Sequence, residues 1–116
     1  MPVSDLKYLK EYSDSDMDFV VEMIELFLDN TPGFVRDLVN ALENKEFDTI
    51  AKTAHKMKPS MTFMGLSNGK ELCVSIEYEA KNHPFEPLLS EKVHALDKLC
   101  QEAFVELKDE LEKIKS

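Results

Sequence analysis

Apolar residues recur with the period of an α-helix along almost the whole chain, and this pattern constrains the fold more than any other feature. The chain has three glycines and neither an Asn-Gly nor an Asp-Gly hairpin turn, so the sequence predicts no strand. The pattern is clearest in residues 88–115, where apolar side chains follow a near-heptad spacing: Leu89, Val93, Leu96, Cys100, Ala103, Leu107, Leu111 and Ile114. We therefore expect an all-α protein.

Polar and helix-breaking segments divide this pattern into six expected helices. Asn30-Thr31-Pro32 is expected to end the second helix, with Thr31 capping the third and Pro32 at its first position. The expected helices cover about residues 4–11, 16–29, 32–43, 46–64, 67–81 and 88–115. Short connections make consecutive helices antiparallel neighbours, which predicts an up-and-down four-helix bundle with additional short N-terminal helices.

The length of 116 residues fits one domain, which we expect to span 1–116. The sequence has no apolar run long enough to cross a bilayer and no signal-peptide pattern. Cys73 and Cys100 lie far apart without a CxxC motif, which favours reduced core thiols and a cytoplasmic location. The leading Met1 and the lack of a linker favour a free-standing protein over a segment of a hybrid kinase.

The charge of the chain is unevenly distributed. A net charge of −9 argues against binding to nucleic acid or to anionic membranes. The segment from Thr49 to Lys70 nevertheless contains four lysines, at positions 52, 56, 58 and 70, and no acidic residue. This segment is interpreted either as a solvated helix face or as a site for an anion, and its coincidence with a histidine favours the second.

That histidine, His55, lies at the edge of a predicted apolar stripe formed by Ile50, Ala54, Met57, Met61 and Met64. Its own helix face carries Lys52, Lys58 and Thr62. The residues three or four positions away offer no metal ligand, so we expect no metal site. His83 and His94 are not part of a cluster of catalytic or metal-binding residue types. The chain also has neither a glycine-rich phosphate loop nor the nucleophile elbow of a hydrolase.

The chemistry that remains for His55 is nucleophilic attack by its imidazole on an anionic group. Nearby lysines would neutralise charge on a transferring phosphoryl group. For one ring nitrogen to attack, the other needs a hydrogen-bond acceptor, and Glu77 is a candidate. If the helical hairpin turns near Leu66, His55 lies eleven residues before the turn and Glu77 eleven after it, and Gly69 permits close helix packing. The alternative is that Glu77 is an ordinary exposed acid.

These residues resemble the histidine-containing phosphotransfer (HPt) domains of two-component phosphorelays. The family signature, His-x-(Leu/Met)-Lys-Gly-Ser preceded by Ala, corresponds to residues 54–60, and the likeness covers roughly residues 6–82. Further matching positions lie on both sides of this signature: Phe27, Leu28, Thr31, Pro32, Leu38, Ala41, Leu42, Gly65, Leu66, Leu72, Cys73 and Glu77.

The resemblance implies a bacterial phosphorelay intermediate without kinase activity of its own. His55 would accept a phosphoryl group from the aspartyl phosphate of one receiver domain and pass it to the aspartate of another. Lys58 would lie beside the phosphate and Glu77 would orient the imidazole, while Lys81 falls near a position that is sometimes basic. The implied partners are receiver domains, with a hybrid kinase as a further partner, and Mg²⁺ would come from the receiver. We expect a monomer.

Pro59 departs from the signature, which most often has glycine there. Proline removes a helical hydrogen bond and is expected to bend the helix locally, while its small ring preserves access for a partner. Around His55 we count Lys52, Lys56, Pro59, Thr62 and Lys81 as candidate supporting or partner-binding residues.

Two other functions remain as alternatives. One is a fragment of a sensor-kinase dimerisation domain, whose histidine box requires an acid directly after the histidine and proline at the fifth position; here Lys56 follows and Pro59 is the fourth. The other is a non-catalytic helical adaptor that binds signalling partners through its methionine-rich surface.

Overall fold

The computed structural model describes residues 3–12, 14, 16–82 and 84–116, and the regular structure of this part of the chain is entirely helical. The all-α prediction is therefore confirmed. The helices are α1 (Lys7–Tyr12), α2 (Met17–Glu43), α3 (Phe47–Phe63), α4 (Ser67–Asn82) and α5 (Glu86–Lys115). None of them is long and apolar enough to cross a membrane.

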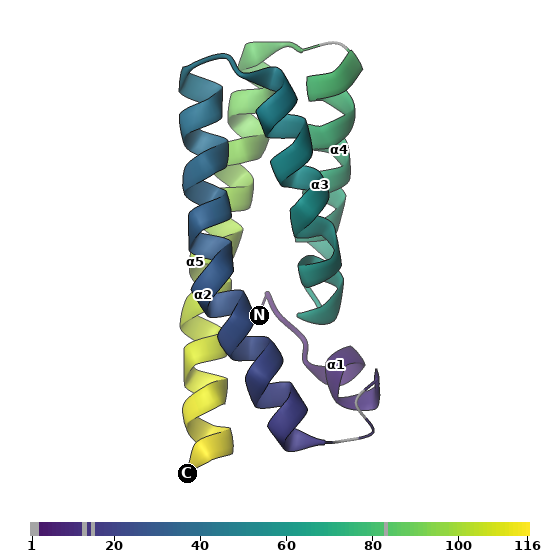
Figure 1. The fold of residues 1–116 in the computed structure, drawn as a ribbon, viewed down its shortest axis with the longest axis vertical. Coiled ribbons are helices and arrows are strands. Elements are labelled where there is room, and N and C mark those ends of the chain that lie inside the picture. Colours follow the sequence, from purple (N-terminus) through teal and green to yellow (C-terminus); the bar gives the residue numbers. More distant parts are fainter. Residues whose placement is uncertain (1–2, 13, 15, 83) are drawn as a thin grey trace.

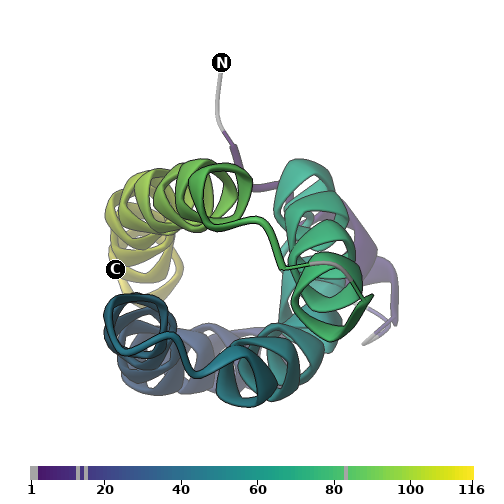
Figure 2. The same ribbon diagram turned by 90° about the horizontal axis from the view of Figure 1, so that it is seen from above.

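Helices α2 to α5 form an up-and-down four-helix bundle, as predicted (Figure 1). Seen along the bundle, each helix packs against two neighbours: α3 lies between α2 and α4, and α5 closes the ring between α4 and α2 (Figure 2). The shorter α3–α4 hairpin leaves the lower ends of α2 and α5 extending beyond it, and α1 lies below this hairpin (Figure 1).

The predicted break at Asn30-Thr31-Pro32 is wrong, because α2 runs without interruption from Met17 to Glu43 with Pro32 inside it. Proline in a helix interior removes one hydrogen bond and costs about 3 kcal/mol. The buried stripe continues across the position, however, through Phe27, Thr31, Val35 and Leu38. Burial of this stripe against the core outweighs the local preference of proline, so Thr31 is a core residue rather than a cap.

Two helix starts also differ from the predictions. Helix α1 begins at Lys7 rather than at 4, because the Asp5 side chain accepts the Lys7 N–H at 2.9 Å. Helix α5 begins at Glu86 rather than at 88, since Pro87 is compatible with the first turn of a helix. His83, and Ser13 in the predicted turn at 12–14, lie outside the described residues.

The core is continuous along the bundle. The predicted α3 stripe is buried completely, from Ile50 through Met57 to Met64, and the near-heptad positions of α5 are buried from Leu89 to Leu107. The fully buried large side chains are Leu9, Ile24, Leu38, Ile50, Met57, Met61, Met64, Leu66, Ile76, Leu89, Leu96 and Leu107. Leu9 comes from α1, so the short helix contributes to the same core.

The segment before α1 crosses the α3–α4 turn. Gly65 ends α3 with φ +67°, and a Cβ there would lie 2.0 Å from the Asp5 carbonyl oxygen. The Asp5 N–H donates to the Met64 carbonyl at 3.0 Å. On α5, the Glu106 carboxylate accepts the Val3 and Ser4 N–H groups at 2.8 and 3.0 Å. The turn that sets the α3–α4 register is thus tied to the N-terminal segment.

Candidate functional site

The His55 side chain projects from the middle of α3 into solvent. Its neighbours Ala54 and Met57 are buried in the core, so His55 lies off the apolar stripe, as predicted. The side chain is 64% exposed. An imidazole in this position is accessible to a partner protein while its backbone belongs to a packed helix.

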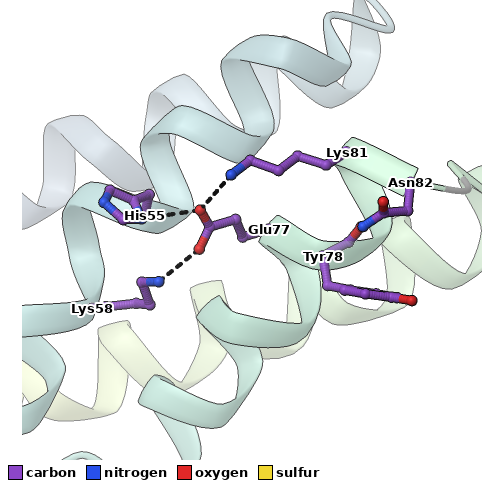
Figure 3. Close-up of polar contacts among 6 residues, drawn as sticks. All are labelled: His55, Lys58, Glu77, Tyr78, Lys81 and Asn82. Carbon is purple, nitrogen blue, oxygen red and sulfur yellow. Dashed lines mark hydrogen bonds and ion pairs between the residues drawn. The ribbon is translucent and has the colours of Figure 1, made fainter.

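Glu77 on α4 contacts the imidazole directly. His55 Nδ1 lies 3.0 Å from Glu77 Oε2 (Figure 3). The same carboxylate accepts hydrogen bonds from two lysines: Lys58 Nζ lies 2.7 Å from Oε1, and Lys81 Nζ lies 3.0 Å from Oε2. We refer to His55, Lys58, Glu77 and Lys81 as the Glu77 cluster. The position of Glu77 beside His55 agrees with the predicted hairpin register.

Close packing of α3 on α4 makes this contact geometrically possible. A Cβ at Gly69 would lie 2.7 Å from the Met61 sulfur on α3 and 3.1 Å from Leu99 Cδ2 on α5, so a larger residue would have to displace these two side chains. Gly69 on α4 therefore has the spacing role that the sequence predicted for it.

The environment of Glu77 keeps its carboxylate ionised and so sets the direction of its hydrogen bond with His55. Hydrogen bonds from Lys58 and Lys81 lower the pKa of Glu77 from 4.5 to about 2, outweighing the opposing effect of burial. The ionised carboxylate only accepts hydrogen bonds, so His55 Nδ1 must be the donor. When the ring is neutral, the proton therefore lies on Nδ1 and the lone pair on Nε2 is free to react.

The other predicted supporting residues lie around the cluster without joining it. Lys52, Lys56 and Pro59 are exposed on α3. The helix continues through Pro59 to Phe63. Thr62 Oγ1 donates to the Lys58 carbonyl at 3.4 Å and lines a 690 Å³ groove between α1, α3 and α4. Only Lys81, of the five supporting candidates, contacts Glu77.

The two cysteines of the chain are poor nucleophiles. Cys73 and Cys100 are free and buried, as predicted. Burial raises the pKa of each thiol to about 12, and in Cys73 this outweighs the opposite effect of Lys58. On α5, the His94 ring contacts the Ser90 carbonyl one turn earlier. Among the described residues, no group of three or more His, Cys, Asp or Glu side chains is arranged to hold a metal ion.

Sequence reasoning missed that Glu77 binds both lysines at once. A signal for Lys81 was present, because Glu77 and Lys81 are four residues apart in the order that favours a helical ion pair. The Lys58 contact depends on the spacing between two helices and had no such local signal. Tyr78 and Asn82, the other residues in this view, bond to each other through the Tyr78 carbonyl rather than to the carboxylate (Figure 3).

The sequence and the fold both match known proteins. A family model described as the Hpt domain matches residues 22–116. Histidine-containing phosphotransfer protein 2 of Arabidopsis thaliana is 31% identical over 85 residues, which cover 69% of this chain and 53% of that protein. Phosphotransferase RcsD of Escherichia coli K12 is 34% identical over 53 residues, covering 46% of this chain and 6% of that protein.

Two solved structures share the fold. Histidine-containing phosphotransfer protein B of Pseudomonas aeruginosa PAO1 matches with a TM-score of 0.83 at 18% identity, over 97% of this chain and 96% of that chain. The HPT domain of a sensor hybrid histidine kinase from Shewanella matches with a TM-score of 0.87 at 19% identity, over 98% of this chain and 97% of that chain.

Together, fold and site define a helical-bundle protein with an exposed histidine bonded to an ionised carboxylate. The chain belongs to the Hpt domain family. It spans about half the length of the plant relative and a small part of RcsD. These relatives come from a plant and a bacterium, so the predicted bacterial source is not confirmed.

Proposed function

We propose that this protein is a phosphorelay intermediate in which His55 accepts a phosphoryl group from a receiver aspartate and passes it to another. The observation that carries the proposal is the bond between His55 Nδ1 and the Glu77 carboxylate, 3.0 Å long, on a side chain that is 64% exposed. This arrangement leaves Nε2 as the ring nitrogen that is free to react. Family membership supports the same reaction.

In the proposed step, the lone pair of His55 Nε2 forms a bond to phosphorus while the bond from phosphorus to the aspartyl oxygen breaks. The aspartate leaves as a carboxylate and the proton stays on Nδ1, so the ring gains one positive charge. Glu77 is positioned to balance that charge, because it is ionised and bonded to Nδ1. Donation to a second receiver is the same step in reverse.

We assign Lys58 two duties in this reaction. In the unphosphorylated protein its ammonium binds Glu77 Oε1 at 2.7 Å and so orients the carboxylate. During transfer, the same positive charge lies next to the imidazole and stabilises the phosphoryl group electrostatically. We expect Mg²⁺ to be bound by the receiver, and the residues of this chain to contribute positive charge, orientation and the nucleophile.

A monomer is the expected form, because one chain supplies all four helices of the bundle. The dimerisation domain of a sensor kinase would need two chains to close such a bundle, so a tight dimer in light scattering would favour that alternative. A cytoplasmic location remains a prediction that cell fractionation tests.

Radiolabel transfer tests the proposal. A receiver phosphorylated with ³²P is mixed with the wild-type chain and with His55→Gln. We expect acid-labile, base-stable label on the wild type and none on the variant. Label that persists on His55→Gln would refute His55 as the acceptor. If that variant instead supported signalling like the wild type in cells, the adaptor function would replace the proposed one.

A further inference from the structure

The exposed face of α3 carries positive charge that the Glu77 cluster does not use. Lys52 and Lys56 flank His55 on this helix, and both are exposed. In the described part of the chain, neither lysine forms an ion pair with a carboxylate. Asp48, in the first turn, is the single acidic residue of α3. Lys52 and Lys56 are therefore free to interact with an approaching partner.

The carboxylate of the site does not cancel this charge. Glu77 is 12% exposed and binds two ammonium groups, so it contributes little negative potential at the surface. We define the basic face as Lys52, Lys56, Lys58 and Lys81 around His55. With Glu77 included and the histidine neutral, this face has a net charge of +3, so the rest of the chain has a net charge of −12.

We propose that the basic face selects and orients acidic partners, so that a receiver with an acidic rim around its phosphorylated aspartate meets this protein at His55. The inference rests on the proposed function and names the kind of receiver it uses. An aspartyl phosphate brings two negative charges, which the basic face attracts. The remaining surface repels an acidic protein, so encounters elsewhere on the bundle are disfavoured.

Association kinetics test this directly. The probe is the receiver domain that passes label fastest to the wild-type chain. Its second-order rate constant for phosphotransfer is measured by rapid quench between low and high salt. We expect Lys52→Gln combined with Lys56→Gln to lower this constant about tenfold at low salt, and the difference to shrink as salt screens the charges.

A matched control changes the same charge elsewhere. Lys98 and Lys108 are exposed on α5, which lies diagonally across the bundle from α3 (Figure 2). Lys98→Gln combined with Lys108→Gln removes the same two charges, and we expect it to change the rate constant less than twofold. The loss in the α3 variant should lie in the second-order rate constant rather than in the rate at saturating receiver.

The outcomes separate the two proposals. Equal salt dependence in the α3 and α5 variants would overturn the role of the basic face while leaving His55 as the acceptor. Transfer that is insensitive to salt in the wild type would do the same. If no receiver passes label to the wild-type chain, the proposed function and this inference both fail.

Discussion

His55 Nδ1 and Glu77 Oε2 lie 3.0 Å apart although 22 residues separate them in the chain. The contact arises because α3 and α4 form a hairpin that turns at Gly65 and Leu66 and packs closely at Gly69. Since the Glu77 carboxylate is ionised, this hydrogen bond places the proton of the neutral ring on Nδ1 and leaves Nε2 free.

Glu77→Gln should slow phosphotransfer about tenfold while His55 can still be phosphorylated. The amide oxygen of glutamine can still accept the Nδ1 proton, but it carries no charge to balance the ring when Nε2 binds phosphorus. Single-turnover transfer from a receiver measures the effect, and circular dichroism verifies that the bundle is intact. A variant that transfers at the wild-type rate would show that the charge of Glu77 is not used.

Acid should remove the stabilising contribution of Glu77. Because the Lys58 and Lys81 hydrogen bonds lower the pKa of Glu77 from 4.5 to about 2, its ionised form stabilises the fold above pH 4.5, and this contribution is lost as pH falls toward 2. We expect the difference in unfolding free energy between wild type and Glu77→Gln to be about 1–2 kcal/mol at neutral pH, allowing for the exposure of Lys81.

Urea denaturation of both proteins between pH 7 and pH 2.5 measures this difference. Glu106→Gln is the positive control. Burial alone would raise the pKa of Glu106, but hydrogen bonds from Val3 and Ser4 lower it. The stabilising contribution of this carboxylate should therefore also be lost in acid. A difference between wild type and Glu77→Gln that stays constant across this range would contradict the shifted pKa.

Gly65→Ala should destabilise the protein by about 2–4 kcal/mol. Gly65 has φ +67°, and an added Cβ would lie 2.0 Å from the Asp5 carbonyl oxygen, so the N-terminal segment has to move. Gly33→Ala is the matched control, since its Cβ would lie 3.7 Å from the nearest group, Arg36 Nη2, and α2 should become about 0.5–1 kcal/mol more stable. Chemical denaturation compares the two, and equal effects would refute the argument.

Most of the architecture was predictable because helical periodicity is a local property repeated over many residues. The register of His55 against Glu77 was predictable as well, since Gly65 marks the turn and both residues lie eleven positions from Leu66. The continuity of α2 was not predictable from the sequence, because proline acts locally while the burial of Val35 and Leu38 depends on helices distant in sequence. The bond between Lys58 and Glu77 likewise depends on the distance between two helices.

Pro32→Ala should stabilise the bundle by about 1–2 kcal/mol. Position 32 lies inside α2, where alanine adds the N–H that a helical hydrogen bond needs. Part of that gain is offset because proline also restricts the unfolded chain. Thermal and urea denaturation measure the change. A loss of stability would mean that the proline ring contributes packing that outweighs the missing hydrogen bond.

The position of the phosphoryl group tests the central claim most directly. The chain is labelled with ¹⁵N at its histidine rings, phosphorylated by a receiver, and analysed by NMR for coupling between ³¹P and each ring nitrogen. We predict that phosphorus is bonded to Nε2 of His55 and that Nδ1 keeps its proton beside Glu77. Phosphorus on Nδ1, or on a residue other than His55, would contradict the account.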